Sequence, residues 1–330
     1  MGRLYAPIIR TESNWISLRQ GREEHIIMGY GRNTTLGLCG WSLITGSLVL
    51  ALKPGACHGE IAIADPEPVI MAGAYVLPAG VPYDSPTLRV DANLQSSPFA
   101  GIGSLAIYGA IQASAVVISP THILTAAHAV DVDHDGVVDV LPETLEFHLN
   151  LDGDSTDVLG VTAIALHPDF TGFNNPSLND DIAVLTLDGP VPEGTPIYPL
   201  YDKPLAQSQT VTLVGYGASG WGDLGFRYPY FENLHVKRVG QNAVDIAFLD
   251  DESGLYREVY AFDFDDPAGV INITGGPSLG NTVETTLGFG DSGGPALILD
   301  DGYYKLAGIN TFIGRFVGQT AQAPMFGSAG

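Results

Sequence analysis

The sequence has few basic residues. Lys and Arg total 14 against 37 Asp and Glu in 330 residues, which gives a formal net charge of -23. Because so acidic a chain repels phosphate groups, this balance argues against a nucleic acid or an anionic membrane surface as a partner. It fits a soluble exported protein, and it leaves carboxylates available for hard cations.

Cysteine is scarce as well. The chain contains only Cys39 and Cys57, which do not make a disulfide framework, and neither lies at metal-ligand spacing from a histidine or another cysteine. No pair of histidines has zinc-binding spacing either. Hydrophobic residues make up 45% of the sequence, which excludes a disordered chain and provides a core for one large domain or two small ones.

Charge is absent from an apolar stretch near the N-terminus, residues 33–52, which Arg32 precedes and Lys53 follows. This pattern predicts a signal peptide or, as the alternative, an uncleaved membrane anchor. The preceding segment is long for a signal peptide, so Met28 is a second candidate start. Small residues favour cleavage between positions 56 and 64. We therefore expect a secreted protein, extracellular or periplasmic, and a membrane-anchored one if the stretch is retained.

Long helical patterns are also missing. Apolar runs of strand length alternate instead with Gly, Pro, Asn and Asp, and the chain contains 41 glycines and 22 prolines. This pattern predicts an all-β fold, a barrel or a sandwich. The main runs are 104–111, 115–119, 161–166, 182–187, 210–217, 243–249, 295–299 and 305–313.

Three short stretches carry residues suited to catalysis. His128 follows a small-residue turn in SPTHILTAAHAV, and Asp181 directly precedes an apolar strand in SLNDDIAVLTL. Ser292 lies among glycines in GFGDSGGPAL. A serine hydroxyl is a weak nucleophile that needs a base within hydrogen-bond reach, and an imidazole titrates near neutrality. A buried carboxylate would orient that imidazole and stabilise its protonated form.

The glycines around Ser292 suit a second requirement of acyl transfer. The N–H groups of Gly290 and Ser292 can converge on one point, where an oxyanion would form. The letters GDSGG also fit the G-x-S-x-G turn of α/β-hydrolases, which needs its acid and its histidine after the serine. No histidine follows Ser292, since the last is His235. The order His128, Asp181, Ser292 is that of chymotrypsin.

With LTAAH, NDDIAVL and GDSGGP in this order, the chain resembles the trypsin/chymotrypsin family of serine endopeptidases, in a bacterial-type secreted form without disulfides. The resemblance implies two antiparallel six-stranded β-barrels with the active site between them. It implies protein or peptide substrates and no required cofactor, and we expect a monomer without a nucleic-acid partner. Residues 1–64 would be an N-terminal extension, 65–89 a candidate propeptide and 90–330 the protease domain.

The resemblance also implies further site residues. It makes Asp291 the partner of an N-terminal amine that cleavage would release, with Arg89–Val90 as one candidate cleavage site and residues 69–74 as the other. Thr286 replaces an aspartate at the pocket floor, so cleavage after Lys or Arg is not implied, and Ile313 narrows the pocket. The positions assigned to the substrate pocket are Thr286, Thr311, Phe312 and Ile313.

One acidic stretch, residues 131–139, matches the first nine positions of a calcium-binding loop. At the twelfth position Pro142 replaces the usual glutamate, and Glu143 stands one residue later. The alternative is a solvated acidic turn, in which His134 would face solvent. The carboxylates that would bind a structural calcium ion are Asp131, Asp133, Asp135 and Asp139.

Two functions from different classes follow from the sequence. The first is an active serine endopeptidase that works through His128, Asp181 and Ser292. The second is a catalytically inactive binding protein with a protease fold, an idea that the short stretch after the last expected strand supports. Degenerate members usually lose one of the three residues, and their presence here favours the enzyme.

Overall fold

The computed structural model describes residues 70–77, 79–109, 111–152, 155–173, 178–228, 236–252 and 257–316, together with five short strands nearer the ends. The chain divides into two units, Met1–Leu43 and Ile44–Gly330. The first contains a hairpin of β1 (Ile16–Gln20) and β2 (Glu23–Ile27). In the second, β3 (Ser47–Leu50), β4 (Ile61–Ala64), β19 (Gly314–Phe316) and β20 (Ser328–Ala329) form one sheet.

The predicted signal peptide or anchor, residues 33–52, lies outside the described residues apart from β3. Among the residues that the structure describes, no helix has the length and apolar character needed to cross a membrane. The only helical elements in this part of the chain are two single 3₁₀ turns, η1 (Ala127–Ala129) and η2 (Pro142–Thr144).

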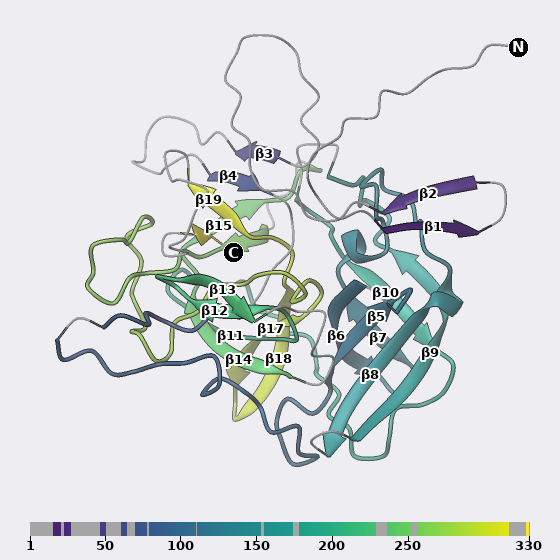
Figure 1. Ribbon diagram of the computed structural model, residues 1–330, viewed down its shortest axis with the longest axis horizontal. Coiled ribbons are helices and arrows are strands. Elements are labelled where there is room, and N and C mark those ends of the chain that lie inside the picture. Colours follow the sequence, from purple (N-terminus) through teal and green to yellow (C-terminus); the bar gives the residue numbers. More distant parts are fainter. Residues whose placement is uncertain are drawn as a thin grey trace, which may run out of the picture. The chain divides into compact units, whose positions relative to one another are not determined.

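Six antiparallel strands close into a barrel in the order β10-β7-β6-β5-β8-β9, which confirms one of the two predicted barrels (Figure 1). In β10 the side chains alternate between core and surface, with Ala183, Leu185 and Leu187 buried, whereas every position of β5 is buried. The strands are β5 (Ile102–Ile107), β6 (Ile111–Ser119), β7 (His122–Thr125), β8 (Leu145–Asp152), β9 (Ser155–Leu166) and β10 (Ala183–Leu187).

The pattern of the apolar run 104–111 suggests one strand, but the run contains parts of two, β5 and β6. The chain reverses after β5, where Tyr108 and Gly109 both have positive φ, 53° and 62°. Glycine adopts this conformation without steric cost, and the tyrosine beside it hides the turn within an apolar run. The two strands then pair from Ile102 opposite Val116 to Ile107 opposite Ile111.

The second half of the fold is β-rich but is not a closed six-stranded barrel within the described residues. Its main sheet has the order β14-β11-β17-β18, beside two separate hairpins, β12-β13 and β15-β16. It agrees with the predicted all-β class and is consistent with the predicted second barrel, whose closure stays a prediction. The strands are β11 (Thr210–Gly215), β12 (Ser219–Trp221), β13 (Gly225–Tyr228), β14 (Arg238–Ala243), β15 (Ile246–Leu249), β16 (Arg257–Ala261), β17 (Pro295–Asp300) and β18 (Tyr303–Ile309).

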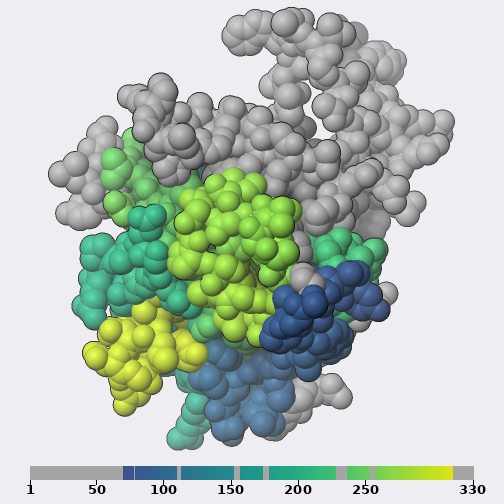
Figure 2. All heavy atoms as spheres, turned by 90° about the vertical axis from the view of Figure 1, so that its left-hand side faces the viewer, coloured from purple at the N-terminus to yellow at the C-terminus, as the bar shows by residue number. Residues whose placement is uncertain are grey.

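A long loop lies between β16 and β17. Buried carboxylates accept several of its backbone N–H groups. Asp263 accepts N–H bonds from Ile273 and Thr274, and Glu284 accepts those of Asp265 and Leu279. Figure 2 shows this loop in yellow-green beside the dark blue segment that contains residues 79–95.

The two halves meet at β6. The Ser114 hydroxyl donates to the Gly290 carbonyl at 2.8 Å and accepts the Tyr216 N–H at 3.0 Å, and the Ser114 N–H donates to the Ser292 carbonyl at 2.8 Å. One hydrophobic cluster also combines Val116 of the barrel with Leu297 of the second sheet. These contacts hold the loop that contains Ser292 against the barrel.

Candidate active site

His128 lies on the 3₁₀ turn η1, directly after β7. Small alanines surround it in the sequence, so the backbone can turn tightly while Ala127 packs in the barrel core. The His128 N–H donates to Asp181 Oδ1 at 2.8 Å, which joins the turn to the segment that leads into β10. This bond fixes the backbone of His128 relative to Asp181, independently of the imidazole ring.

The structure brings His128, Asp181 and Ser292 into one chain of hydrogen bonds. His128 Nδ1 lies 2.7 Å from Asp181 Oδ2, and His128 Nε2 lies 2.8 Å from Ser292 Oγ. Because a carboxylate only accepts, it selects the tautomer with the proton on Nδ1, and Nε2 is then free to accept the serine proton. All three residues are buried, with 7%, 3% and 5% of their surface exposed.

The turn around Ser292 requires glycine. Gly290 and Gly293 have φ values of 101° and 78°, where an L side chain is strained. A Cβ on Gly293 would also collide with Thr125 Oγ1. Among the described residues none accepts the N–H groups of Gly290 or Ser292, whereas Gly293 donates to Asn310 O. The oxyanion role of the first two stays a prediction.

The four predicted pocket residues separate into different surroundings. Thr286 is fully buried, and its carbonyl accepts the Met71 N–H at 3.1 Å. Ile313 belongs to the hydrophobic cluster that contains Met71, whereas Phe312 belongs to the one that contains Leu178. Thr311 is half-buried and donates from its hydroxyl to the Ile309 carbonyl. Their role in substrate selection stays a prediction.

Asp291 has no exposed surface and no cation in direct contact within the described residues. Its carboxylate accepts the N–H of Gly217 at 2.9 Å and that of Ile70, while Oδ2 has no hydrogen-bond partner in this part of the chain. Burial raises the pKa of Asp291 to about 8. A cation placed at Oδ2 would offset this penalty.

Of the two candidate cleavage sites, Arg89–Val90 includes a side chain with several partners. Arg89 is buried, forms an ion pair with Asp84 at 2.6 Å, and donates to the Val283 and Glu284 carbonyls. Cleavage after Arg89 stays a prediction. The alternative, residues 69–74, includes Ile70, whose N–H reaches Asp291.

The acidic stretch 131–139 forms a compact loop. Asp131 is fully buried and accepts the N–H groups of Asp135 and Gly136, at 3.1 and 2.8 Å. Asp131, Asp133 and Asp139 each have a carboxylate oxygen within 4.8 Å of the others, and Asp135 is not in this group. Calcium binding stays a prediction, with three of the four predicted ligands brought together.

The solvated-turn interpretation expected His134 to face solvent, and the structure differs from it. His134 is half-buried, and burial, followed by the charge of His128, lowers its pKa to about 4. Its ring centroid lies 6.5 Å from that of His128, and Phe173 lies 5.4 Å from both. Sequence reasoning missed both neighbours, because neither lies in a recognisable motif.

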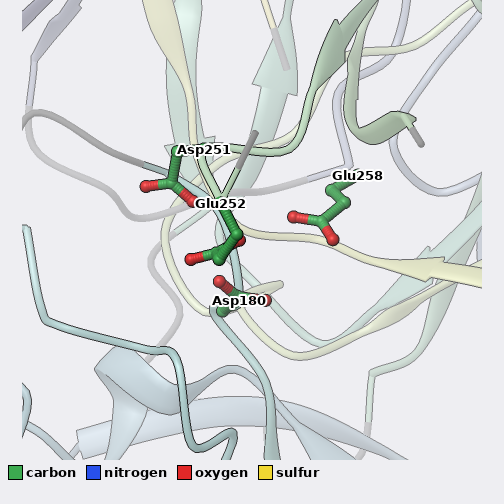
Figure 3. A group of neighbouring side chains, drawn as sticks. All are labelled: Asp180, Asp251, Glu252 and Glu258. Carbon is green, nitrogen blue, oxygen red and sulfur yellow. The ribbon is translucent and has the colours of Figure 1, made fainter. Parts of the chain in front are cut away.

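A second acidic group lies beside Asp181. Asp180, Asp251, Glu252 and Glu258 each have a carboxylate oxygen within 4.8 Å of the others. Figure 3 shows these four side chains as one group. Asp180 also pairs with His167 at 3.1 Å. Burial raises the pKa of the Asp180 carboxyl, and like charges nearby add to the effect.

Comparison with known proteins matches the chain to a peptidase family and to solved structures. The family described as trypsin-like peptidase domain matches residues 113–309. A crystal structure of the scabies mite inactivated protease paralogue S-I1 is similar at 18% sequence identity and a TM-score of 0.41, and the match covers 73% of this chain and 91% of that one. No curated protein sequence matches the chain.

Proposed function

The chain belongs to the trypsin-like peptidase domain family, and on this basis we propose that it is a serine endopeptidase. Peptides or proteins are its substrates, and Ser292, His128 and Asp181 are nucleophile, base and orienting carboxylate. The observation that carries the proposal is the unbroken hydrogen-bond chain from Asp181 Oδ2 through the imidazole to Ser292 Oγ, with separations of 2.7 and 2.8 Å.

The reaction proceeds in two stages. Ser292 Oγ attacks the peptide carbonyl while His128 Nε2 takes its proton, and the N–H groups of Gly290 and Ser292 stabilise the resulting oxyanion. His128 then gives the proton to the leaving amine, and an acyl-enzyme remains. Water repeats the sequence with His128 as base, so hydrolysis regenerates the serine. Asp181 stabilises the imidazolium at both stages.

Asp291 supports a requirement for N-terminal processing. A buried carboxylate with one oxygen unsatisfied is a suitable partner for an α-ammonium group, and Ile70 already lies against it. Cleavage before Ile70 would place that ammonium at the carboxylate without displacing the rest of the segment. The mature enzyme would then begin at Ile70, with Ile70, Met71 and Ala72 remaining in the core.

Peptide hydrolysis by the chain starting at Ile70 tests the proposal. Ser292→Ala removes the nucleophile with little change in volume. Ser85→Ala is a matched control at another buried serine, whose hydroxyl bonds to Thr87. We expect turnover by the wild type and by Ser85→Ala, and none by Ser292→Ala, with all three equally folded. Folded wild-type protein without turnover on a mixed peptide library would favour the inactive binding protein instead.

A further inference from the structure

Two aromatic residues beside His128 have no part in the proposed mechanism. The ring centroid of Phe173 lies 5.4 Å from that of His128, and the ring centroid of His134 lies 6.5 Å away. His134 and Phe173 are themselves 5.4 Å apart at an interplanar angle of 34°. The three rings form one cluster, while the two nitrogen atoms of His128 bond to Asp181 and Ser292.

A close backbone contact between two loops brings His134 and Phe173 together. Gly136 and Gly172 both have positive φ. A Cβ on Gly136 would lie 2.9 Å from the Thr171 carbonyl carbon, and one on Gly172 would collide with the His134 carbonyl. The two backbones are thus closer than any side chain at these positions would allow, and this contact sets the separation of the two rings.

The loop of His134 and the side chain of Phe173 each make further contacts of their own. The Asp131 carboxylate accepts the N–H groups that follow His134, at Asp135 and Gly136, which fixes the loop locally. Phe173 packs against the barrel core, and Phe170 meets it edge-on with ring centroids 6.0 Å apart. The Phe173 ring is therefore anchored by packing, and the backbone that carries His134 is fixed by hydrogen bonds.

We propose that His134 and Phe173 are positioning residues, which hold the His128 imidazole in the rotamer that bonds to both Asp181 and Ser292. The inference rests on the proposed function. The hydrogen bonds act on the nitrogen atoms of the ring, whereas the two aromatic neighbours restrict its rotation about χ1 and χ2. Catalysis is sensitive to this restriction, because a displacement of about 1 Å costs roughly a hundredfold in rate.

Steady-state kinetics of three variants tests this role. His134→Ala removes a ring and should lower kcat about tenfold while KM changes by less than about twofold, because substrate contacts remain. His134→Phe keeps a ring and should recover most of kcat. His148→Ala, at a half-buried histidine that pairs with Glu146, is the matched control and should behave as the wild type. Wild-type kcat for His134→Ala, or equal losses in the alanine and phenylalanine variants, would overturn the inference.

A second measurement does not depend on turnover. In a Ser292→Ala background, proton NMR can follow the proton between His128 Nδ1 and Asp181, which resonates far downfield. We expect this signal to broaden or disappear on adding His134→Ala and to persist with His134→Phe. An unchanged signal in the alanine variant would refute the positioning role. An inactive wild type with the signal intact would contradict the proposed function alone.

Circular dichroism accompanies both measurements, because the alanine substitution leaves a gap beside the core. If His134→Ala does not fold, His134→Gln replaces it, since glutamine fills a similar volume without a ring. We expect the glutamine variant to show the same loss of kcat and of the NMR signal. Wild-type values for a folded glutamine variant would again overturn the inference.

Discussion

The buried carboxyl group of Asp291 makes the stability of the uncleaved chain depend on pH. Its pKa is raised from 3.8 to about 8 in the folded chain. Above pH 4 the unfolded chain has lost this proton, while the folded chain retains it until about pH 8. Stability therefore falls as pH rises through this window and stays low above it. At about 1.4 kcal/mol for each pH unit, the loss is about 6 kcal/mol at most.

Asp291→Asn removes this titration and keeps an oxygen that can accept the Gly217 N–H. In uncleaved chains that also carry Ser292→Ala, we expect the asparagine variant to be more stable at pH 8, and to gain little at pH 4. Urea unfolding at several pH values measures both. Burial also raises the pKa of Asp245 and of Asp265, so both chains lose stability as the pH rises. The prediction therefore concerns the difference in stability between the chains with and without Asp291→Asn.

The processed chain gives the opposite prediction. Once Ile70 carries a free ammonium group, Asp291 becomes its counter-ion, and Asp291→Asn should lower stability at pH 8. Asp202→Asn, at an exposed aspartate, serves as the control in both chains. Before cleavage, parallel pH dependences for the chains with and without Asp291→Asn would refute the burial argument. Stabilisation of the processed chain by asparagine would refute the ammonium pairing.

Three further perturbations test other parts of the account. Asp181→Asn should lower kcat by about 10⁴ with folding retained, because an amide no longer selects the Nδ1–H tautomer, and a loss below tenfold in steady-state kinetics would contradict this. Gly293→Ala should destabilise the fold by at least about 2 kcal/mol in thermal or urea unfolding, since it strains the backbone and collides with Thr125; an unchanged midpoint would show that the turn adapts. If the 131–139 loop binds calcium, millimolar Ca²⁺ should raise the melting temperature of the wild type and not of Asp131→Asn, and chelation should reverse it; equal shifts in both would rule out this loop.

The residues that the sequence reveals are those in short local motifs. His128, Asp181 and Ser292 each stand at a turn beside an apolar strand, and the chemistry of acyl transfer explains why these three types occur together. The all-β class follows from the same alternation of apolar runs and turn residues. The distances among His128, Asp181 and Ser292 cannot be predicted in this way, because they depend on barrel closure and on the contact of Ser114 with the Ser292 loop.

The features that sequence reasoning missed depend on contacts between distant segments. His134 stands among aspartates, and the structure places its ring against Phe173, where the two loops make a close backbone contact at Gly136 and Thr171. Arg89 precedes a candidate mature N-terminus, and the sequence does not reveal that its buried side chain pairs with Asp84 and donates to two carbonyls. Asp263 and Glu284 accept backbone N–H groups in the loop after β16, and no sequence periodicity signals these contacts.

Active-site labelling tests the central claim most directly. A fluorophosphonate reacts with a serine that its base and oxyanion donors activate, so it reports the assembled site without knowledge of the substrate. We predict that the chain starting at Ile70 gains one adduct, that peptide mapping places it on Ser292, and that Ser292→Ala and Asp181→Asn gain little or none. A folded wild-type chain without an adduct, or with its adduct on another residue, would contradict the assignment of Ser292 as the nucleophile.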